Sequence, residues 1–329
     1  MTKRLGLVGC GLLAGAVALG AQRSEPAATN DVQALHVQGN VWMLHSAVAN
    51  AAVQVGEDGV LVVDTMTGPL AAALVAEIRR IAPGKPIRWI VNTHADPDHT
   101  GGNLTVAEAG ESIIAGNFAG QAGAAQADYA QIIAHEEVLT RMLAQEPAPP
   151  VFAQPSETFF VPKFELYYNG EPIEILHVPN AHCDGDVLVF FRKSDVVVAG
   201  DLFVTTTFPM IRLEQGGSVT GVLAGLNRLL DITVPKEKQE GGTYVIPGHG
   251  RLADEADVVD YRDMVTIIRD RVADARARGL TLEQIRAARL LRDYEGRWGA
   301  TEGPWTTAAF LEAVHRSLAG EARGGSKGE

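Results

Sequence analysis

The sequence of 329 residues predicts a layered α/β fold followed by a helical C-terminal part. Short apolar runs typical of buried strands alternate with amphipathic stretches of helical period. Several of the runs end in a loop marked by Gly or Pro, with a His or Asp at the turn. Open α/β sheets collect their ligands at the carboxyl ends of the strands, so this pattern also predicts where a functional site would lie.

The N-terminus has the pattern of a secretory signal over residues 1–21. Lys3 and Arg4 precede an apolar run that ends at Gly20. The run is too short and too rich in Gly for a stable membrane span. We therefore expect an exported, periplasmic protein. The LVGC sequence at 7–10 resembles a lipoprotein cleavage box, which makes lipid anchoring the alternative.

The chain is acidic, with a formal net charge of −12 that would become −14 once Lys3 and Arg4 leave with the signal. Clusters of Lys and Arg are missing from the sequence, so phosphate backbones should be repelled. A small-molecule substrate is therefore expected, and nucleic acid is not. Cys10 would leave with the signal and Cys183 would remain alone, so no internal disulfide is expected. The sequence does not specify an oligomeric state.

A main domain is expected over residues 36–319, after a mobile linker at 22–35. Between Val41 and Met66, apolar runs predict short strands, two of them joined by a hairpin turn at 57–59. Pro69 then opens a helix in which four apolar residues share one face: Leu70, Leu74, Ile78 and Ile81. The next strand is predicted at Ile87–Val91.

Further strands are predicted in the middle of the chain. They are Ser112–Ala115, Gln131–Ala134, Leu166–Tyr168, Ile173–Val178, Val187–Phe191 and Val196–Ala199, with a loop at Asn117–Ala127. The helical part covers about 256–319. Its first helix is predicted to end at Gly279, and a capping box at 281–284 to open the next. The last helix is predicted at 308–318. Residues 320–329 are expected to form a disordered tail.

The strongest functional signal is the segment VNTHADPDHTGG at 91–102. His94, Asp96, Asp98 and His99 place two imidazoles and two carboxylates within six residues. Such groups repel or desolvate one another unless a cation lies between them. The alternative is that the two Asp residues are ordinary turn or cap residues beside Pro97. That alternative leaves the imidazoles unexplained, so a divalent cation is predicted.

Three downstream strand ends carry further candidates. His182 follows the strand Ile173–Val178, Asp201 ends the run VVVAGD, and His249 lies in the segment YVIPGHG. In this order the motifs resemble the metallo-β-lactamase superfamily. That family has His-x-His-x-Asp-His, then a single His, a Gly-Asp after a strand, and a Pro-Gly-His-Gly-like end. The resemblance extends from about Val41 to the C-terminus.

The resemblance implies a four-layer αββα sandwich with two divalent metal ions. His94, Asp96 and His182 would hold the first ion, and Asp98, His99 and His249 the second, with Asp201 bridging both. Zinc is expected. Asp96 stands where the family has its second His, and a carboxylate is a harder donor, so iron or manganese is the alternative at the first site. Alternatively, Asp96 does not bind the metal and instead accepts a hydrogen bond from a histidine that does.

The implied activity is hydrolysis of a small-molecule ester, thioester, lactone or lactam by a hydroxide that the two cations share. Asp98 would be the catalytic residue, orienting the nucleophile or passing a proton to the leaving group. The alternative is a non-haem iron oxygenase or redox enzyme of the same fold that uses His94, Asp96 and His182.

Several other residues have both a functional and a structural interpretation. Asp64, at a strand end, either buttresses the ligand loop, as in relatives, or is a plain turn residue. His135 could face the cleft, whereas His177 is expected to pack within its strand. Cys183, beside a candidate ligand, is expected to be a small structural residue, with a redox-sensitive thiol as the alternative.

Overall fold

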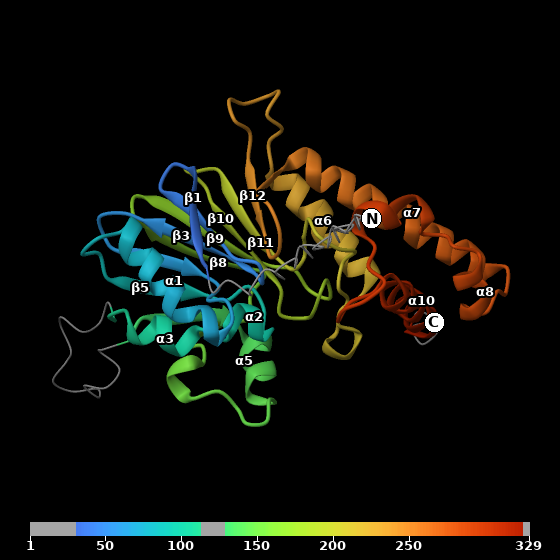
Figure 1. Cartoon of the computed structure of the whole chain (residues 1–329), viewed down its shortest axis with the longest axis horizontal. Coiled ribbons are helices and arrows are strands. Elements are labelled where there is room, and N and C mark those ends of the chain that lie inside the picture. The colour runs from blue at the N-terminus through green and yellow to red at the C-terminus, as the bar shows by residue number, and fades with distance from the viewer. Residues whose placement is uncertain (1–30, 113–128, 325–329) are drawn as a thin grey trace, which may run out of the picture.

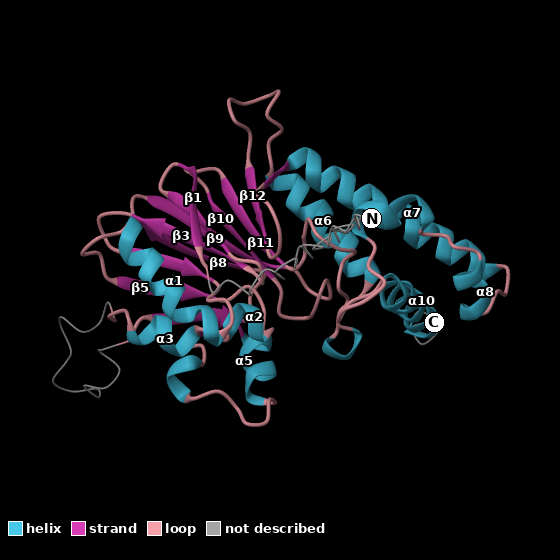
Figure 2. Cartoon of the chain, in the orientation of Figure 1, coloured by secondary structure: helices cyan, strands magenta, loops and turns pink. Residues whose placement is uncertain are grey.

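The computed structural model describes residues 31–112 and 129–324, which form two β-sheets with helices on both outer faces (Figures 1 and 2). The first sheet has the order β1-β2-β3-β4-β5-β6-β7 and the second β13-β12-β11-β10-β9-β8. The strands of the first sheet are β1 (Gln33–Gln38), β2 (Val41–His45), β3 (Asn50–Val55), β4 (Val60–Val63), β5 (Ile87–Val91), β6 (Gln131–His135) and β7 (Glu157–Phe159). Those of the second are β8 (Lys163–Tyr168), β9 (Glu171–His177), β10 (Val187–Phe191), β11 (Val196–Gly200), β12 (Tyr244–Pro247) and β13 (Ala253–Asp254).

The helices divide between the two outer faces (Figure 2). Alongside the first sheet lie α1 (Gly68–Ile81), α2 (Pro97–Thr100), α3 (Asn103–Glu108) and α5 (Glu136–Leu143). Next to the second lie α6 (Val219–Ile232) and α7 (Glu255–Ala277), and the remaining helices α8 (Leu282–Ala287), α9 (Arg292–Trp298) and α10 (Thr307–Gly324) follow them, with α10 in contact with α6, α7 and α8. The predicted four-layer αββα sandwich with C-terminal helices is confirmed.

Alternation along the strands explains why both faces of each sheet are covered. In β4, Leu61 and Val63 pack between the two sheets, whereas Val60 and Val62 pack against α1. Successive strand residues point to opposite faces, so a strand that is apolar throughout needs a partner layer on each side. The same holds for β11, in which Val198 faces the first sheet and Val197 faces the C-terminal helices.

Most of the predicted elements are present. The strands around Val41–Met66, the helix opened by Pro69 and the strand Ile87–Val91 are β2 to β5 and α1. The capping box at Thr281 is formed, with both reciprocal hydrogen bonds to Gln284. Helices α5, α6 and α9 were not predicted from the sequence. The predicted strand Ser112–Ala115, apart from Ser112, and the loop Asn117–Ala127 lie outside the described residues, as does the signal at 1–21.

Two predicted boundaries are wrong. Strand β1 begins at Gln33, inside the range expected to be a linker at 22–35. It pairs antiparallel with β2, but none of its residues is buried and it lacks the apolar run that reveals a buried strand. Helix α10 continues to Gly324, into the range expected to be a disordered tail at 320–329. One Gly in a helix interior costs only about 1 kcal/mol relative to Ala, which the good helix formers around Gly320 can offset.

The topology brings the candidate residues to one end of the sandwich. Strands β4 and β5 run parallel, and so do β11 and β12, so the carboxyl ends of each pair lie at the same sheet edge. A backbone hydrogen bond of 3.0 Å from Val187 N, at the start of β10, to Thr93 O, in the loop after β5, joins the two sheets there. Among the described residues, no helix combines the length and apolar character needed to cross a bilayer.

Candidate metal centre

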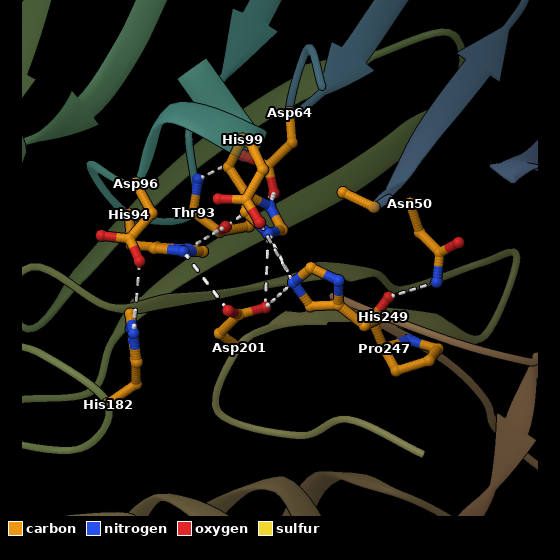
Figure 3. Close-up of polar contacts among 12 residues, drawn as sticks. Asn50, Asp64, Thr93, His94, Asp96, His99, His182, Asp201, Pro247 and His249 are labelled. Atoms are coloured by element: carbon orange, nitrogen blue, oxygen red, sulfur yellow. Dashed lines mark hydrogen bonds and ion pairs between the residues drawn. The ribbon is translucent and has the colours of Figure 1, made fainter. Parts of the chain in front are cut away.

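Four strand ends deliver the polar side chains of the centre (Figure 3). The loop after β5 carries His94 and continues into the short helix α2, and the loop after β9 carries His182. Asp201 directly follows β11 and His249 lies two residues after β12. These segments are far apart in sequence, but their side chains turn toward one another in Figure 3.

The side chains form two clusters. In the first cluster, His94, Asp96, His182 and Asp201 each offer one ligand atom, and these atoms all lie within 4.8 Å of one another. The same limit applies to the second cluster, Asp98, His99 and His249. All seven residues predicted as metal ligands are therefore brought together.

Asp201 lies between the clusters. Its Oδ1 is 3.3 Å from His99 Nε2 and 3.2 Å from His249 Nε2, and its Oδ2 is 3.8 Å from His94 Nε2. His99 Nε2 and His249 Nε2 are themselves 3.5 Å apart. One carboxylate thus faces imidazoles of both clusters, which is the arrangement that a bridging ligand requires.

The second cluster is held by partners outside the centre. His99 Nδ1 donates to Asp64 Oδ2 at 2.8 Å, and His249 Nδ1 donates to the backbone oxygen of Val48 at 2.6 Å. With the Nδ1 proton placed outward, each ring directs Nε2 toward the centre. Hydrogen bonds of this kind fix the tautomer of metal-binding histidines.

The first cluster follows the same pattern. His182 Nδ1 donates to Asp186 Oδ1 at 3.3 Å. The Thr93 hydroxyl donates to Asp64 Oδ2 at 2.6 Å, which leaves its oxygen to accept the proton of His94 Nδ1 at 2.9 Å. All four imidazoles therefore present Nε2 inward.

Two of the inward atoms, His94 Nε2 and His182 Nε2, are buried without any hydrogen-bond partner among the described residues. Leaving buried polar atoms unpaired is unfavourable by about 1–3 kcal/mol each. Neutral imidazole nitrogens and carboxylate oxygens are the donor set of zinc and similar divalent ions. The residues present therefore fit a metal centre.

The electrostatics of the metal-free site are strongly perturbed. Burial, reinforced by His99, lowers the pKa of His94 well below its usual value. Burial alone would lower the pKa of His99, but Asp201 and Asp64 outweigh it and raise the pKa well above its usual value. Burial alone would raise the pKa of Asp201, but His99 and His249 lower it well below its usual value. Without a cation the centre thus retains protons on some imidazoles, and cation binding must release them.

Asp64 is the buttress that the sequence suggested. Its carboxylate is buried and accepts hydrogen bonds from Thr93 N at 2.8 Å, Thr93 Oγ1 and His99 Nδ1. Its backbone is left-handed, with φ of 62°, a conformation that Asp and Asn adopt more readily than other non-glycine residues. Asp64 thereby fixes the histidines of both clusters from outside.

Two glycines allow the close approach of backbone to the centre. A Cβ on Gly248 would lie 2.0 Å from Asp201 Oδ1. Gly200 has φ of +51°, and a Cβ there would lie 2.7 Å from Thr93 Oγ1. Any side chain at either position would displace the hydrogen-bonded groups that hold the candidate ligands.

Three residues at the centre were not predicted from the sequence. Arg212 hydrogen-bonds to Asp96, and Asp186 to His182. Asn50 donates to the backbone oxygens of Pro247 and Gly250, at 2.9 and 3.0 Å, and so holds the His249 loop (Figure 3). None of the three belongs to a recognisable motif. The short spacing between His182 and Asp186 is the one local signal that could have been used.

Two further predictions can be settled. His135, which could have faced the cleft, belongs to neither cluster. It is buried and stacks on His177, with ring centroids 3.6 Å apart, and burial together with His177 lowers the pKa of His135 to about 4. Cys183 is buried, and burial with Asp186 raises the pKa of its thiol well above the usual value. Its redox interpretation is therefore not supported, because reactive thiols are exposed and have a low pKa.

The family model of the metallo-beta-lactamase superfamily matches residues 47–249, more than half of the chain. The chain belongs to this superfamily. It is similar to the α subunit of a 2,4-dinitroanisole O-demethylase from Nocardioides sp. (strain JS1661), at 25% identity over 51% of this chain and 45% of that protein. The chain thus spans less than half of that relative.

Solved structures with the same fold include the stereoselective inverting sec-alkylsulfatase Pisa1 from Pseudomonas sp.. Its TM-score is 0.61 at 15% identity, over 87% of this chain and 50% of that one. A metallo-beta-lactamase from Pontibacter korlensis gives a TM-score of 0.52 at 16% identity, over 72% of this chain and 99% of that one.

Proposed function

We propose that this protein is a dinuclear metal-dependent hydrolase of a small molecule. The observation that carries the proposal is the position of Asp201 between two clusters of inward-facing ligand atoms. His94, Asp96 and His182 would hold one divalent ion and Asp98, His99 and His249 the other, with Asp201 shared. Bound there, the two ions would activate water as a nucleophile and stabilise negative charge that develops on the substrate.

Differences in exposure indicate from which side a substrate reaches the centre. The side chains of Asp98 and His249 are 31% and 24% exposed, whereas those of His94, His99 and His182 are at most 1% exposed. Substrate and water would therefore enter beside the second cluster. Asp98 Oδ2, 3.4 Å from His249 Nε2, is in a position to accept a proton from the nucleophile or return one to the leaving group.

We propose zinc in both sites, with iron or manganese as the alternative in the first, where Asp96 supplies a harder donor. A mononuclear iron oxygenase built on His94, Asp96 and His182 would use only the first cluster. It would leave the convergence of Asp98, His99 and His249 on the same point without a role. That second cluster favours hydrolysis.

We propose an ester, thioester, lactone or lactam as the substrate. The names of the similar proteins add two bonds worth testing, a sulfate ester and an aryl methyl ether. The fold alone does not select among these, because substrate choice in such folds depends on loops around a constant site.

The test combines metal analysis with a substrate panel. Protein purified without added metal should hold two divalent ions per chain and hydrolyse at least one of six reporters: an ester, thioester, lactone, lactam, sulfate ester or aryl methyl ether. His249→Ala should abolish turnover, whereas the control His36→Ala, an exposed histidine outside both clusters, should not. Fully metallated protein that cleaves none of the reporters and consumes oxygen instead would refute hydrolysis.

We also propose export to the periplasm, on the basis of the charged and apolar pattern of residues 1–21. Cell fractionation, with N-terminal sequencing of the recovered protein, tests this. A chain recovered from the cytoplasm with Lys3 and Arg4 still attached would contradict it.

A further inference from the structure

The side chain of Asp96 does not cap the helix that it precedes. Asp96 is the N-cap residue of α2, a position where Asp usually accepts a hydrogen bond from the helix backbone. Its side chain makes no such bond, although its backbone oxygen accepts from His99 N and Thr100 N at 3.0 Å. The carboxylate is instead buried, with 7% of its surface exposed, and turned into the first cluster.

A single arginine orients this carboxylate. Arg212 donates from both Nε and Nη2 to Asp96 Oδ2, at 3.1 and 2.5 Å. No described residue donates a hydrogen bond to the other oxygen, Oδ1. Two donors of one planar guanidinium restrict the carboxylate more than a single flexible donor would. The carboxylate thus retains acceptor capacity for a cation while its orientation is fixed.

Arg212 is also hydrogen-bonded to a second residue of the first cluster, His182. Its backbone N donates to His182 O at 2.8 Å, and the same Asp96 Oδ2 that it binds is 3.7 Å from His182 Nε2. Gly217 packs against this junction, where a Cβ would lie 2.2 Å from His182 O and 3.0 Å from Arg212 N. Arg212 therefore fixes Asp96 relative to His182.

The positive charge of Arg212 also offsets the negative charge of Asp96. Asp96 stands where the family motif has a His, so the exchange adds one negative charge to the first cluster. The guanidinium of Arg212 adds one positive charge beside it. Because the Arg212 side chain is 41% exposed, solvent screens much of this charge, so orientation is the larger effect.

We infer that Arg212 is a positioning residue: with Asp96 it forms a two-residue replacement for the missing histidine and sets the metal affinity of the first cluster. This inference rests on the proposed dinuclear centre. It predicts that Arg212 contributes to the metal affinity of the first cluster only while residue 96 is Asp.

The experiment is a double-mutant cycle at positions 96 and 212, measured as Zn²⁺ affinity. Metal-free protein is titrated with Zn²⁺ against a chromophoric chelator, and the binding step that Asp96→Ala weakens is assigned to the first cluster. Arg212→Met should weaken that step at least about tenfold, as loss of an outer partner of a metal ligand does. Arg212→Lys should also weaken it, because Lys lacks the planar fork. In the Asp96→His background, Arg212→Met should change the affinity less than about threefold.

Arg286→Met is the matched control, since Arg286 is also 41% exposed and pairs with Glu312 away from the centre. It should leave both steps unchanged. The Asp96→His, Arg212→Met protein also shows whether loss of Arg212 is compatible with folding. Unchanged or tighter binding in Arg212→Met, full recovery in Arg212→Lys, or an equal loss in the Asp96→His background would each overturn the inference. A wild-type protein that binds no Zn²⁺ would instead overturn the dinuclear centre itself.

Discussion

The two ligand clusters differ in how they meet solvent. In the first, His94, Asp96 and His182 are buried, and an arginine that is not a ligand fixes the carboxylate. In the second, Asp98 and His249 are partly exposed, and no arginine among the described residues pairs with Asp98. The difference suggests a division of work: the buried cluster is built to hold an ion in one geometry, and the exposed cluster to meet water and substrate.

Asp201→Asn is the strongest test of this division, because Asp201 is common to both clusters. The amide keeps the shape but removes the charge that faces His94, His99 and His249. Metal content should fall from two ions per chain to one or none, and turnover should fall by about a thousandfold or more, exceeding the 10- to 100-fold typical of outer partners. Elemental analysis and steady-state rates measure both effects. Retention of two tightly bound ions would show that the clusters are independent.

Asp98→Asn should separate ion binding by the first cluster from the chemistry at the second. Asp98 is the exposed carboxylate, so we expect kcat to fall about 100-fold, within the range of general acid–base catalysis. The first-cluster Zn²⁺ affinity should stay within about threefold of wild type. The free energy of unfolding of the metal-free protein should change by less than about 0.5 kcal/mol, as is usual for a substitution away from the core. A loss of first-cluster Zn²⁺ would place Asp98 in the buried site.

Asp64→Asn tests the shared support behind the clusters. Asn tolerates the left-handed backbone, but its amide cannot accept all three hydrogen bonds that the carboxylate accepts. We expect Zn²⁺ affinity to fall about 10- to 100-fold and the free energy of unfolding to fall by about 2 kcal/mol. Chelator titration and urea unfolding check the two numbers. If the Zn²⁺ affinity and the free energy of unfolding both keep their wild-type values, Asp64 is only a turn residue.

These residues also show how far the sequence could predict the structure. The seven candidate ligands were predictable because each follows an apolar strand and the sheet topology gathers strand ends. Arg212 was not predictable, since it lies 116 residues from Asp96 in the sequence. It also lies in a loop, where no periodic pattern marks its position. Strand β1 was missed because none of its residues is buried. Helix α6 left a signal that could have been used: Val219, Val222, Leu226 and Leu229 are buried at helical spacing.

The pH dependence of the metal-free protein tests the proton content of the centre. Burial lowers the pKa of His99, His182 and His249, but neighbouring carboxylates outweigh it and raise all three above 6.5. Below pH 6.5 the folded and unfolded chains both carry these protons, and the stabilisation is fully present. As the pH rises further, the unfolded chain loses protons that the folded chain retains, so stability falls.

The free energy of unfolding of the metal-free protein should fall by up to about 1.4 kcal/mol per pH unit for each proton that only the folded state keeps. Saturating Zn²⁺ should remove the trend, because the ion displaces those protons, and Zn²⁺ affinity should rise with pH. Urea unfolding from pH 6.5 to about 8.5, with and without Zn²⁺, measures this. A metal-free protein that gains stability over this range would show that the imidazoles are neutral without metal.

Cys183→Ser should have the smallest effect, and it refines the description of the buried cluster. The thiol donates to Asp186 Oδ1 at 3.0 Å, the same oxygen that accepts from His182 Nδ1. A serine hydroxyl can make the same donation, so Zn²⁺ affinity should change less than about threefold and stability by less than about 1 kcal/mol. Cys183→Ala, which removes the donor, should weaken Zn²⁺ binding more than Cys183→Ser does. Since the thiol is buried with a raised pKa, an alkylating reagent should label it only after unfolding. Rapid labelling of the folded, Zn²⁺-loaded protein would mean that solvent reaches behind His182, and the contrast between a closed and an open cluster would then be lost.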